Sequence, residues 1–431
     1  MVEHNQDDNR SFLVGISGPE TGAREADALL DELQALVSTI GLQTVDRQTV
    51  RVREISPRYY LGTGKAEELA QAARDADANV IVFDEELSPA QQRNWEQLSK
   101  LSVTDRQGII LEIFADRAQT HEAHLQVELA RMEYFLPRLT SAWSHLSRQR
   151  GGRRGTRGEG ETQLEVDRRI VLRRIASLKR ELSGVRNGRA IMRKQRLAST
   201  TPNGSIVGYT NAGKSSLLQA LTGARLEVAN KLFATLDPAT RRLELDGGQE
   251  VLLTDTVGFI RRLPHGLVEA FKSTLEETVI SDFLIHVMDA SDAAIHQHAQ
   301  VTREVLVEIG SANTPTIQVL NKSDLVDPDY LEMLRLEFPE AVGVSARTGN
   351  GLDALQDRVR EVTTLNFSRV AVSLPHDRYD LAALIHRTGH VVHEDYEGDG
   401  IRIDADVPER TRQKLMEFAI AEPARAERKS E

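Results

Sequence analysis

A phosphate-binding loop is predicted at residues 208–215. The sequence GYTNAGKS there fits the pattern GxxxxGK[ST], and it lies between an apolar strand and a helical stretch. Glycines let backbone N–H groups close around phosphate oxygens, and the N-terminus of the helix adds a favourable dipole. Lys214 would reach the β- and γ-phosphates, and Ser215 would bind Mg²⁺. The predicted phosphate-binding residues are Gly208, Tyr209, Thr210, Asn211, Ala212, Gly213, Lys214 and Ser215.

A second motif, LLTDTVG at residues 252–258, follows the loop along the chain. An apolar strand that ends in DxxG places a carboxylate near the metal and a glycine N–H near the γ-phosphate. The residues expected there are Asp255, Thr256, Val257 and Gly258. A match to the first loop alone also arises by chance, so this second motif adds weight to it.

Two further motifs predict recognition of guanine. The apolar stretch at 317–320 ends in NKSD, and the residues at 342–344 precede SAR. A carboxylate at Asp324 can accept both N1–H and N2–H of guanine, a paired donor edge that adenine lacks. The guanine-binding residues are expected to be Asn321, Lys322, Ser323, Asp324, Ser345, Ala346 and Arg347. Four motifs in this order predict a GTPase domain.

The stretch between the first two motifs is the expected switch segment. This segment, FATLDPAT at residues 233–240, includes Phe233, Ala234, Thr235, Leu236 and Asp237. Thr235 would complete the Mg²⁺ shell with Ser215 when the γ-phosphate is present, and Thr240 is the alternative for that role. Lys214, Thr235 and Gly258 are the predicted catalytic residues. Asn211 either helps to hold a monovalent cation, K⁺, or only shapes the loop.

The residue after Gly258 is Phe259, where many GTPases have a Gln that orients the attacking water. A phenyl ring cannot do this, so a slow intrinsic rate is predicted, with stimulation by a partner. Arg261 and Arg262 follow closely. They would either neutralise charge that develops on the phosphate or make ordinary surface contacts.

A strongly basic stretch covers residues 138–196. It has 17 Lys or Arg against 5 Asp or Glu, although the whole chain of 431 residues has a net charge of −11. Such asymmetry indicates a surface for nucleic acid or an anionic membrane, with a solvated helical face as the alternative. The loop RQRGGRRGTRGEGETQ at 148–163 carries the predicted RNA-binding residues Arg153, Arg154 and Arg157.

The elements that position these residues predict an α/β chain of four parts. Residues 1–118 alternate strands and helices, as in a small parallel α/β domain, with strands at 12–17, 50–54 and 79–84 and an apolar run at 108–115 closing it. Residues 119–200 have helical spacing on both sides of the basic loop, which indicates a helical hairpin. Residues 201–366 form the P-loop domain, and 367–431 form a small β-α-β-α domain with a disordered tail.

Composition excludes several other classes of function. The chain has no Cys, which excludes disulfides, Cys-bound zinc and thiol nucleophiles and favours the reducing cytoplasm. The apolar runs are too short to span a bilayer, and the polar first residues lack the pattern of a secretion signal. The lack of a sustained coiled coil favours a monomer.

The motifs together resemble those of HflX-type GTPases, in the Obg–HflX branch of the translation-factor-related class. The resemblance rests on GYTNAGKSSL, LFATLDPATR, LTDTVGFI, NKSD, SAR and, most specifically, GGRRGTRGEGETQLE. It covers nearly the whole length, and the hydrophobic residue at Phe259 matches the family. The resemblance implies GTP and GDP as ligands, with residues 233–237 as a switch that contacts the nucleotide. It also implies binding to the large ribosomal subunit and its rRNA, and GTP hydrolysis coupled to dissociating stalled or idle ribosomes under stress. The alternatives are a GTPase that acts on free RNA, and a switch in peripheral contact with a membrane that binds a protein partner.

Overall fold

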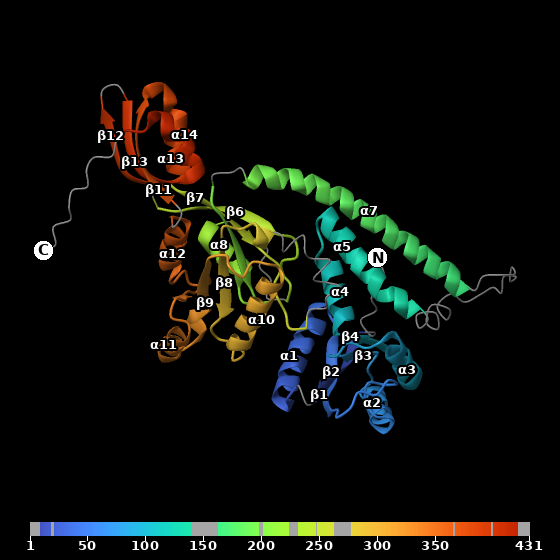
Figure 1. The fold of residues 1–431 in the computed structure, drawn as a ribbon. Helices are drawn as coiled ribbons and strands as arrows, with labels where there is room; N and C mark the ends of the chain where they lie inside the picture. Colours follow the sequence, from blue (N-terminus) through green and yellow to red (C-terminus); the bar gives the residue numbers. More distant parts are fainter. Residues whose placement is uncertain are drawn as a thin grey trace. The chain divides into compact units, whose positions relative to one another are not determined.

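The computed structural model divides by its internal contacts into two compact units. The first contains Met1–Gly188, Asn230–Leu236 and Arg262–Phe271; the second contains Arg189–Ala229, Asp237–Arg261 and Lys272–Glu431. The structure describes residues 9–18, 21–139, 163–197, 201–223, 232–246, 248–262, 277–364, 367–397 and 400–420 (Figure 1). No helix within these ranges is both long enough and apolar enough to cross a membrane.

The first unit is built on a four-stranded parallel sheet in the order β2-β1-β3-β4. Its strands are β1 (Arg10–Ser17), β2 (Gln43–Arg51), β3 (Val80–Phe83) and β4 (Ser102–Asp105). Its helices are α1 (Ala23–Thr39), α2 (Thr63–Asp75), α3 (Pro89–Ser99) and α4 (Arg106–Arg117). Phe12, Phe83 and Trp95 are fully buried in its core, and Trp95 Nε1 donates to the carbonyl of Tyr59 at 2.9 Å. The predicted parallel α/β fold is confirmed.

One strand of this unit differs from its predicted bounds, and the apolar run at 108–115, for which no element type was predicted, is helical. The strand expected at residues 50–54 is β2, which lies mainly before them, and the apolar run at 108–115 lies in helix α4. Asp105 caps this helix, because its Oδ1 accepts from the backbone N of Gly108 at 3.0 Å. A short apolar run has the same composition in a buried helix as in a buried strand, so only the cap distinguishes the two.

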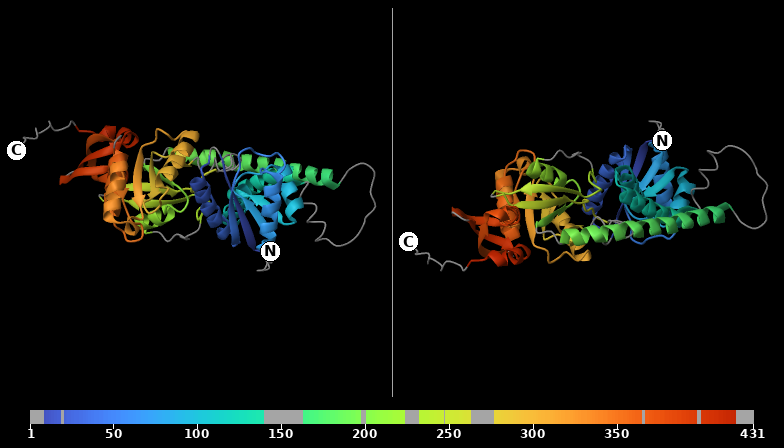
Figure 2. Two further views of the ribbon diagram at one scale, coloured as in Figure 1. Left: turned by 90° about the horizontal axis from the view of Figure 1, so that it is seen from below. Right: turned by 90° about the horizontal axis from the view of Figure 1, so that it is seen from above.

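Two α-helices lie in the described part of the region predicted to be helical. Helix α5 (His121–Phe135) ends before the 3₁₀ turn η2 (Leu136–Arg138), where Pro137 stops it, and α7 (Gln163–Leu197) is a single long helix (Figures 1 and 2). Leu125 of α5 packs with Leu178 and Leu182 of α7. Glu128 accepts two hydrogen bonds from Arg174, each 2.7 Å long. The predicted helices are confirmed, whereas the basic loop between them, with Arg153, Arg154 and Arg157, lies outside the described residues.

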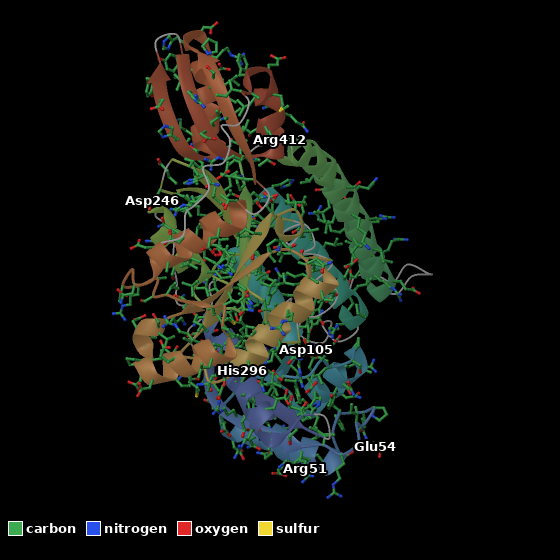
Figure 3. The ribbon with its side chains drawn as sticks, turned by 60° about the vertical axis from the view of Figure 1, so that its left-hand side comes forward. Arg51, Glu54, Asp105, Asp246, His296 and Arg412 are labelled. Atoms are coloured by element: carbon green, nitrogen blue, oxygen red, sulfur yellow. The ribbon has the colours of Figure 1, made fainter. Side chains whose placement is uncertain are left out.

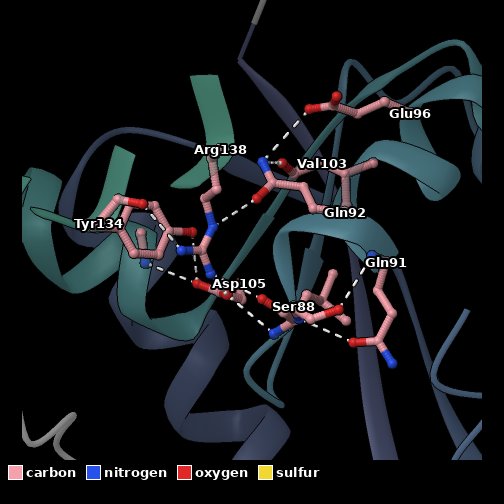
Figure 4. Close-up of polar contacts among 10 residues, drawn as sticks. Ser88, Gln91, Gln92, Glu96, Val103, Asp105, Tyr134 and Arg138 are labelled. Carbon is pink, nitrogen blue, oxygen red and sulfur yellow. Dashed lines mark hydrogen bonds and ion pairs between the residues drawn. The ribbon is translucent and has the colours of Figure 1, made fainter. Parts of the chain in front are cut away.

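A buried polar network joins the end of α5 to the N-terminal sheet (Figure 4). The Arg138 guanidinium stacks on the Tyr134 ring at 3.7 Å and donates to the carbonyl of Leu87 at 2.8 Å. Tyr134 donates to Asp105, at the end of β4 (Figure 3), at 2.9 Å. Burial and the neighbouring Asp105 carboxylate raise the pKa of Tyr134. The α5 helix is therefore fixed to this sheet by charged and polar groups that are fully enclosed.

The second unit contains a six-stranded sheet in the order β10-β9-β8-β5-β7-β6, parallel except for the pair β6–β7. Its strands are β5 (Asn203–Gly208), β6 (Ala239–Glu244), β7 (Glu250–Asp255), β8 (Phe283–Asp289), β9 (Thr316–Asn321) and β10 (Val342–Gly343). Its helices are α8 (Lys214–Thr222), α10 (Ile295–Glu308), η3 (Ser323–Leu325), α11 (Pro328–Glu337) and α12 (Leu352–Thr364). Parallel strands bring their carboxyl ends to one edge, and the motifs of residues 208–215, 255–258 and 321–324 all lie at such ends.

The chain ends in a three-stranded antiparallel sheet in the order β11-β13-β12. Its elements are β11 (Phe367–Pro375), η4 (His376–Arg378), α13 (Tyr379–Thr388), β12 (His390–Glu397), β13 (Gly400–Pro408), α14 (Glu409–Leu415) and η5 (Met416–Phe418). The predicted β-α-β-α order lacked β12. Its sequence HVVHEDYE is mostly polar and occupies a sheet edge, where hydrophobic alternation is weak.

Candidate functional site

The loop at residues 208–215 joins β5 to α8, as the motif predicts. Gly208 and Gly213 have φ angles of 148° and 92°, in the region that favours glycine. A Cβ at Gly213 would lie 2.3 Å from Asn321 Nδ2, and one at Gly208 would lie 2.3 Å from the carbonyl of Val287. Only glycine fits at either position. The loop therefore presents its backbone at the N-terminus of a helix, which is an anion site.

The Lys214 side chain is buried inside this loop. Its Nζ donates to the carbonyls of Gly208, at 3.1 Å, and Tyr209, at 2.8 Å. Burial lowers the pKa of Lys214 to about 8, and the Asp255 carboxylate opposes part of the shift. The ammonium group is thus oriented by the loop before any phosphate binds.

Ser215 and the end of β7 bring oxygen ligands together. The Ser215 hydroxyl donates to Asp255 Oδ2 at 2.6 Å. Thr256 Oγ1 donates to the carbonyl of Ile206 at 2.7 Å, and Val257 is buried. A Cβ at Gly258 would lie 2.9 Å from Lys214 Nζ, so this glycine is in close contact with the phosphate loop. A hydroxyl beside a carboxylate is the donor set that suits Mg²⁺.

The two predicted guanine motifs meet each other and the phosphate loop through Asn321. Its Nδ2 donates to the carbonyl of Ala212 at 2.9 Å, and its Oδ1 accepts from the backbone N of Ala346 at 3.1 Å. Asp324 accepts from the Ser345 hydroxyl at 2.6 Å. Hydrogen bonds therefore join the sequence motifs at 208–215, 321–324 and 345–347.

The remaining residues of these two motifs fix the loops that carry them. Lys322 pairs with Asp289 at 2.6 Å, and the backbone N of Ser323 donates to the carbonyl of Val344 at 3.1 Å. Arg347 is exposed at the end of the set. Asn211 has a φ of 61°, a conformation that Asn adopts more readily than most residues, which favours its loop-shaping role.

The predicted switch segment is divided between the two units. Phe233, Ala234, Thr235 and Leu236 group with the first unit, whereas Asp237 groups with the second. The buried Phe233 ring packs edge-on against Phe114 of α4, with 4.7 Å between ring centroids. No sequence motif predicted that Phe233 packs on Phe114. The role of Thr235 as a metal ligand stays a prediction.

Phe259 is buried beneath the site and does not face it. Its ring packs with Val207, Leu284 and Leu306, which lie on β5, β8 and α10. Its backbone N donates to the carbonyl of Gly208 at 3.1 Å, and its carbonyl accepts from the N of Thr210 at 2.8 Å. A hydrophobic residue at this position therefore anchors the DxxG segment to the phosphate loop.

The two following arginines make protein contacts. Arg261, in the second unit, donates to Gln297 at 3.1 Å. Arg262, in the first unit, donates to Asp84 at 3.2 Å, to Glu85, and to the Thr21 hydroxyl at 3.1 Å. Because both side chains are bonded to other protein side chains, these contacts favour the interpretation that Arg261 and Arg262 make ordinary protein contacts and do not neutralise phosphate charge.

A contact between Tyr209 of the loop and His298 was not predicted from the sequence. The Tyr209 ring stacks on His298 of α10, with 3.7 Å between centroids and 10° between planes. His298 pairs with Asp292 at 3.0 Å, whereas His296, two residues away (Figure 3), pairs with Glu337 at 2.9 Å. No motif in the sequence signals the stack, because its two rings are far apart along the chain.

The chain is similar to known GTP-binding proteins in sequence. The chain matches the family models described as GTP-binding GTPase N-terminal at residues 27–115, GTP-binding GTPase Middle Region at 117–196 and 50S ribosome-binding GTPase at 203–322. A crystal structure of a GTP-binding protein from the archaeon Sulfolobus solfataricus in complex with GDP is 26% identical, with 82% of this chain and 98% of that chain covered and a TM-score of 0.43.

Two relatives match over almost the full length of both chains. GTPase HflX of Akkermansia muciniphila is 46% identical over 421 residues, which cover 95% of this chain and 96% of that protein. GTPase HflX of Lacrimispora saccharolytica is 44% identical over 424 residues, which cover 98% of this chain and 99% of that protein. The chain therefore belongs to the HflX family of GTPases, and its activity is the hydrolysis of GTP.

Proposed function

We propose that this GTPase binds the large ribosomal subunit and uses GTP hydrolysis to split or rescue stalled or idle ribosomes under stress. The match of residues 203–322 to a model described as 50S ribosome-binding GTPase supports the ribosome as partner. The observation that carries the nucleotide part is Asn321, which links the phosphate loop at Ala212 to the guanine motif at Ala346.

The site residues take the following roles in this proposal. The loop from Gly208 to Ser215 holds the phosphates, with Lys214 neutralising charge on the β- and γ-phosphates. Asp324 accepts from the N1–H and N2–H of guanine, and Ser345 orients Asp324 through their 2.6 Å hydrogen bond. Phe233, Ala234, Thr235, Leu236 and Asp237 form the switch that responds to the γ-phosphate.

Mg²⁺ fits the oxygen ligands that the chain provides. Ser215 and Asp255 already meet at 2.6 Å, and both are the hard oxygen donors that Mg²⁺ prefers. Ser215 and Thr235 would bind the ion directly, and the ion would neutralise negative charge on the phosphates. Asn211 would offer its carbonyl to K⁺, which is a weaker proposal because its backbone conformation already accounts for an Asn there.

Hydrolysis requires a water oxygen to attack the γ-phosphorus. The bond from the γ-phosphorus to the bridging oxygen breaks, GDP leaves with that oxygen, and the water proton passes to the released phosphate. Phe259 cannot orient this water, because its ring is buried among Val207, Leu284 and Leu306. The isolated protein is therefore expected to turn over slowly, and the ribosome supplies or orders the missing group.

Arg153, Arg154 and Arg157 bind rRNA phosphates in this proposal. Arginine contacts to phosphate give affinity that falls steeply with salt, and the neighbouring glycines leave room for close approach to RNA. Helix α7 continues the basic stretch, and its Arg174 is held by Glu128. The basic loop would then be presented to the ribosome by a braced pair of helices.

Charge reversal separates ribosome binding from nucleotide binding. Changing Arg153, Arg154 and Arg157 to Glu is expected to abolish salt-sensitive pelleting with large subunits, while GDP affinity stays within twofold of the unmodified protein. The matched control reverses three exposed arginines of the first unit, Arg24, Arg51 and Arg93. Equal loss of ribosome and nucleotide binding in the loop variant, or equal loss of ribosome binding in both variants, would contradict the assignment.

A further inference from the structure

The Tyr209 side chain connects the phosphate loop to the segment that follows DxxG. Its hydroxyl accepts a hydrogen bond from the backbone N of Arg261 at 2.8 Å. The ring is buried and lies almost parallel to the His298 imidazole, at 3.7 Å. This hydrogen bond joins the phosphate loop, through Tyr209, to the backbone at Arg261.

Helix α10 fixes this connection from the other side. His298 Nδ1 pairs with Asp292 at 3.0 Å, and Asp292 also accepts from the backbone N of Ala294 at 2.8 Å. The hydrogen bond from His298 lowers the pKa of Asp292. Gln297, the neighbour of His298, accepts from the Arg261 guanidinium at 3.1 Å. The imidazole that supports the Tyr209 ring is therefore held in one orientation.

These contacts hold Gly258 directly on the phosphate loop. The bond from Arg261 to Tyr209 adds to the two backbone bonds of Phe259 with Gly208 and Thr210. A Cβ at Gly258 would lie 2.8 Å from Thr210 Cα and 2.9 Å from Lys214 Nζ. A γ-phosphate has to reach that same ammonium group. Gly258 and a γ-phosphate therefore compete for the space beside the Lys214 ammonium group.

We propose that the Tyr209 hydroxyl sets the preference of the site for GDP over GTP, by holding residues 258–261 where they exclude the γ-phosphate. The inference rests on the proposed assignment of Lys214 and Gly258 to the γ-phosphate site. Binding of GTP has to break the bond between Tyr209 and Arg261, and binding of GDP does not. Tyr209 acts as a positioning residue, since its hydroxyl contacts the segment that follows DxxG.

The test removes one oxygen atom. Tyr209→Phe keeps the ring stacked on His298 and loses only the acceptor for Arg261. Because GTP binding no longer has to break the hydrogen bond from Arg261, the affinity for a non-hydrolysable GTP analogue relative to GDP is expected to rise by roughly threefold to tenfold, the range that corresponds to the net energy of one hydrogen bond. Fluorescent analogues of both nucleotides give the two dissociation constants. The control is Tyr330→Phe, at an exposed tyrosine on α11, and it is expected to leave the ratio unchanged.

If Tyr209→Phe binds both nucleotides with the same ratio of GTP-analogue affinity to GDP affinity as the unmodified protein, the inference is overturned and the proposed function still stands. Failure of the unmodified protein to bind either guanine nucleotide would instead contradict the proposed function. An equal loss of both affinities in Tyr209→Phe would assign the residue a merely structural role, which also overturns the inference. If Tyr209→Phe does not fold, Gln297→Ala removes the second anchor of Arg261 and must shift the ratio in the same direction.

Discussion

The Asn321 side-chain amide donates to the carbonyl of Ala212 across 2.9 Å, which joins the guanine end of the site to its phosphate end. A Cβ at Gly213 would collide with the same amide group at 2.3 Å. One buried asparagine thus fixes the distance between the predicted phosphate loop and the predicted guanine loop. The phosphate loop cannot shift without breaking this bond.

Replacing Asn321 should weaken the binding of GDP and GTP to the same extent. Asn321→Ala leaves the Ala212 carbonyl and the Ala346 N–H without their partner, and we expect a loss of roughly 10- to 100-fold in affinity for both GDP and GTP. Fluorescence titration with labelled nucleotides measures it, with Asn313→Ala, in an exposed turn, as the control. A variant that binds both nucleotides normally would show that the link is dispensable.

Nucleotide binding should take up a proton above pH 8. Burial lowers the pKa of Lys214 to about 8 in the free protein, and bound phosphates will raise it again. Affinity for GDP is therefore expected to be constant below pH 7 and to fall toward tenfold per pH unit above pH 8. Calorimetry at pH 8.5 in two buffers of different ionisation enthalpy measures the proton directly.

The conservative variant gives the control for this effect. The guanidinium of Lys214→Arg stays charged throughout this range, so any remaining affinity should not depend on pH between 7 and 9. If the unmodified protein takes up no proton at pH 8.5, the buried ammonium is not the group that titrates.

Acid should destabilise the protein through a buried histidine. Burial, and then the positive charges of Arg303 and Lys214, lower the pKa of His286 from 6.5 to about 4. The stability contributed by the neutral ring is complete above pH 6.5 and is lost as the pH falls toward 4. This group alone should lower the free energy of unfolding by about 2 kcal/mol between pH 7.5 and pH 5.

Urea unfolding at the two pH values measures that difference. His286→Leu should flatten the pH dependence by most of this amount, whereas His121→Leu, at an exposed position at the start of α5, should not change it. An unchanged slope in His286→Leu would assign the acid sensitivity to other groups.

The sequence predicts those parts of the site that depend on local geometry. GYTNAGKS, DTVG, NKSD and SAR each encode a loop after a strand, and the structure places each at a strand end. The sheet of the first unit is also predictable, because its apolar strands alternate with helices. Helix α4 shows where prediction from the sequence stops, because Gly108 and the apolar residues after it are as compatible with a strand as with a helix.

Contacts between distant segments could not be predicted. The stack of Tyr209 on His298, the packing of Phe233 on Phe114 and the pairing of Arg262 with Asp84 each join residues that are far apart in sequence. No periodicity or motif encodes such a pair, because only the folded chain brings its members together. The edge strand β12 was missed for a related reason, since its partner β13 defines it.

GTP turnover with and without purified large ribosomal subunits, at low and at high salt, tests the proposed function most directly. We expect slow turnover by the protein alone, because Phe259 cannot orient water, and strong stimulation by large subunits that weakens as salt increases. Naked RNA that stimulated turnover to the same level would transfer the role of activating partner from the ribosome to free RNA. Bound GTP with no stimulation by large subunits at either salt concentration would show that the ribosome is not the activating partner.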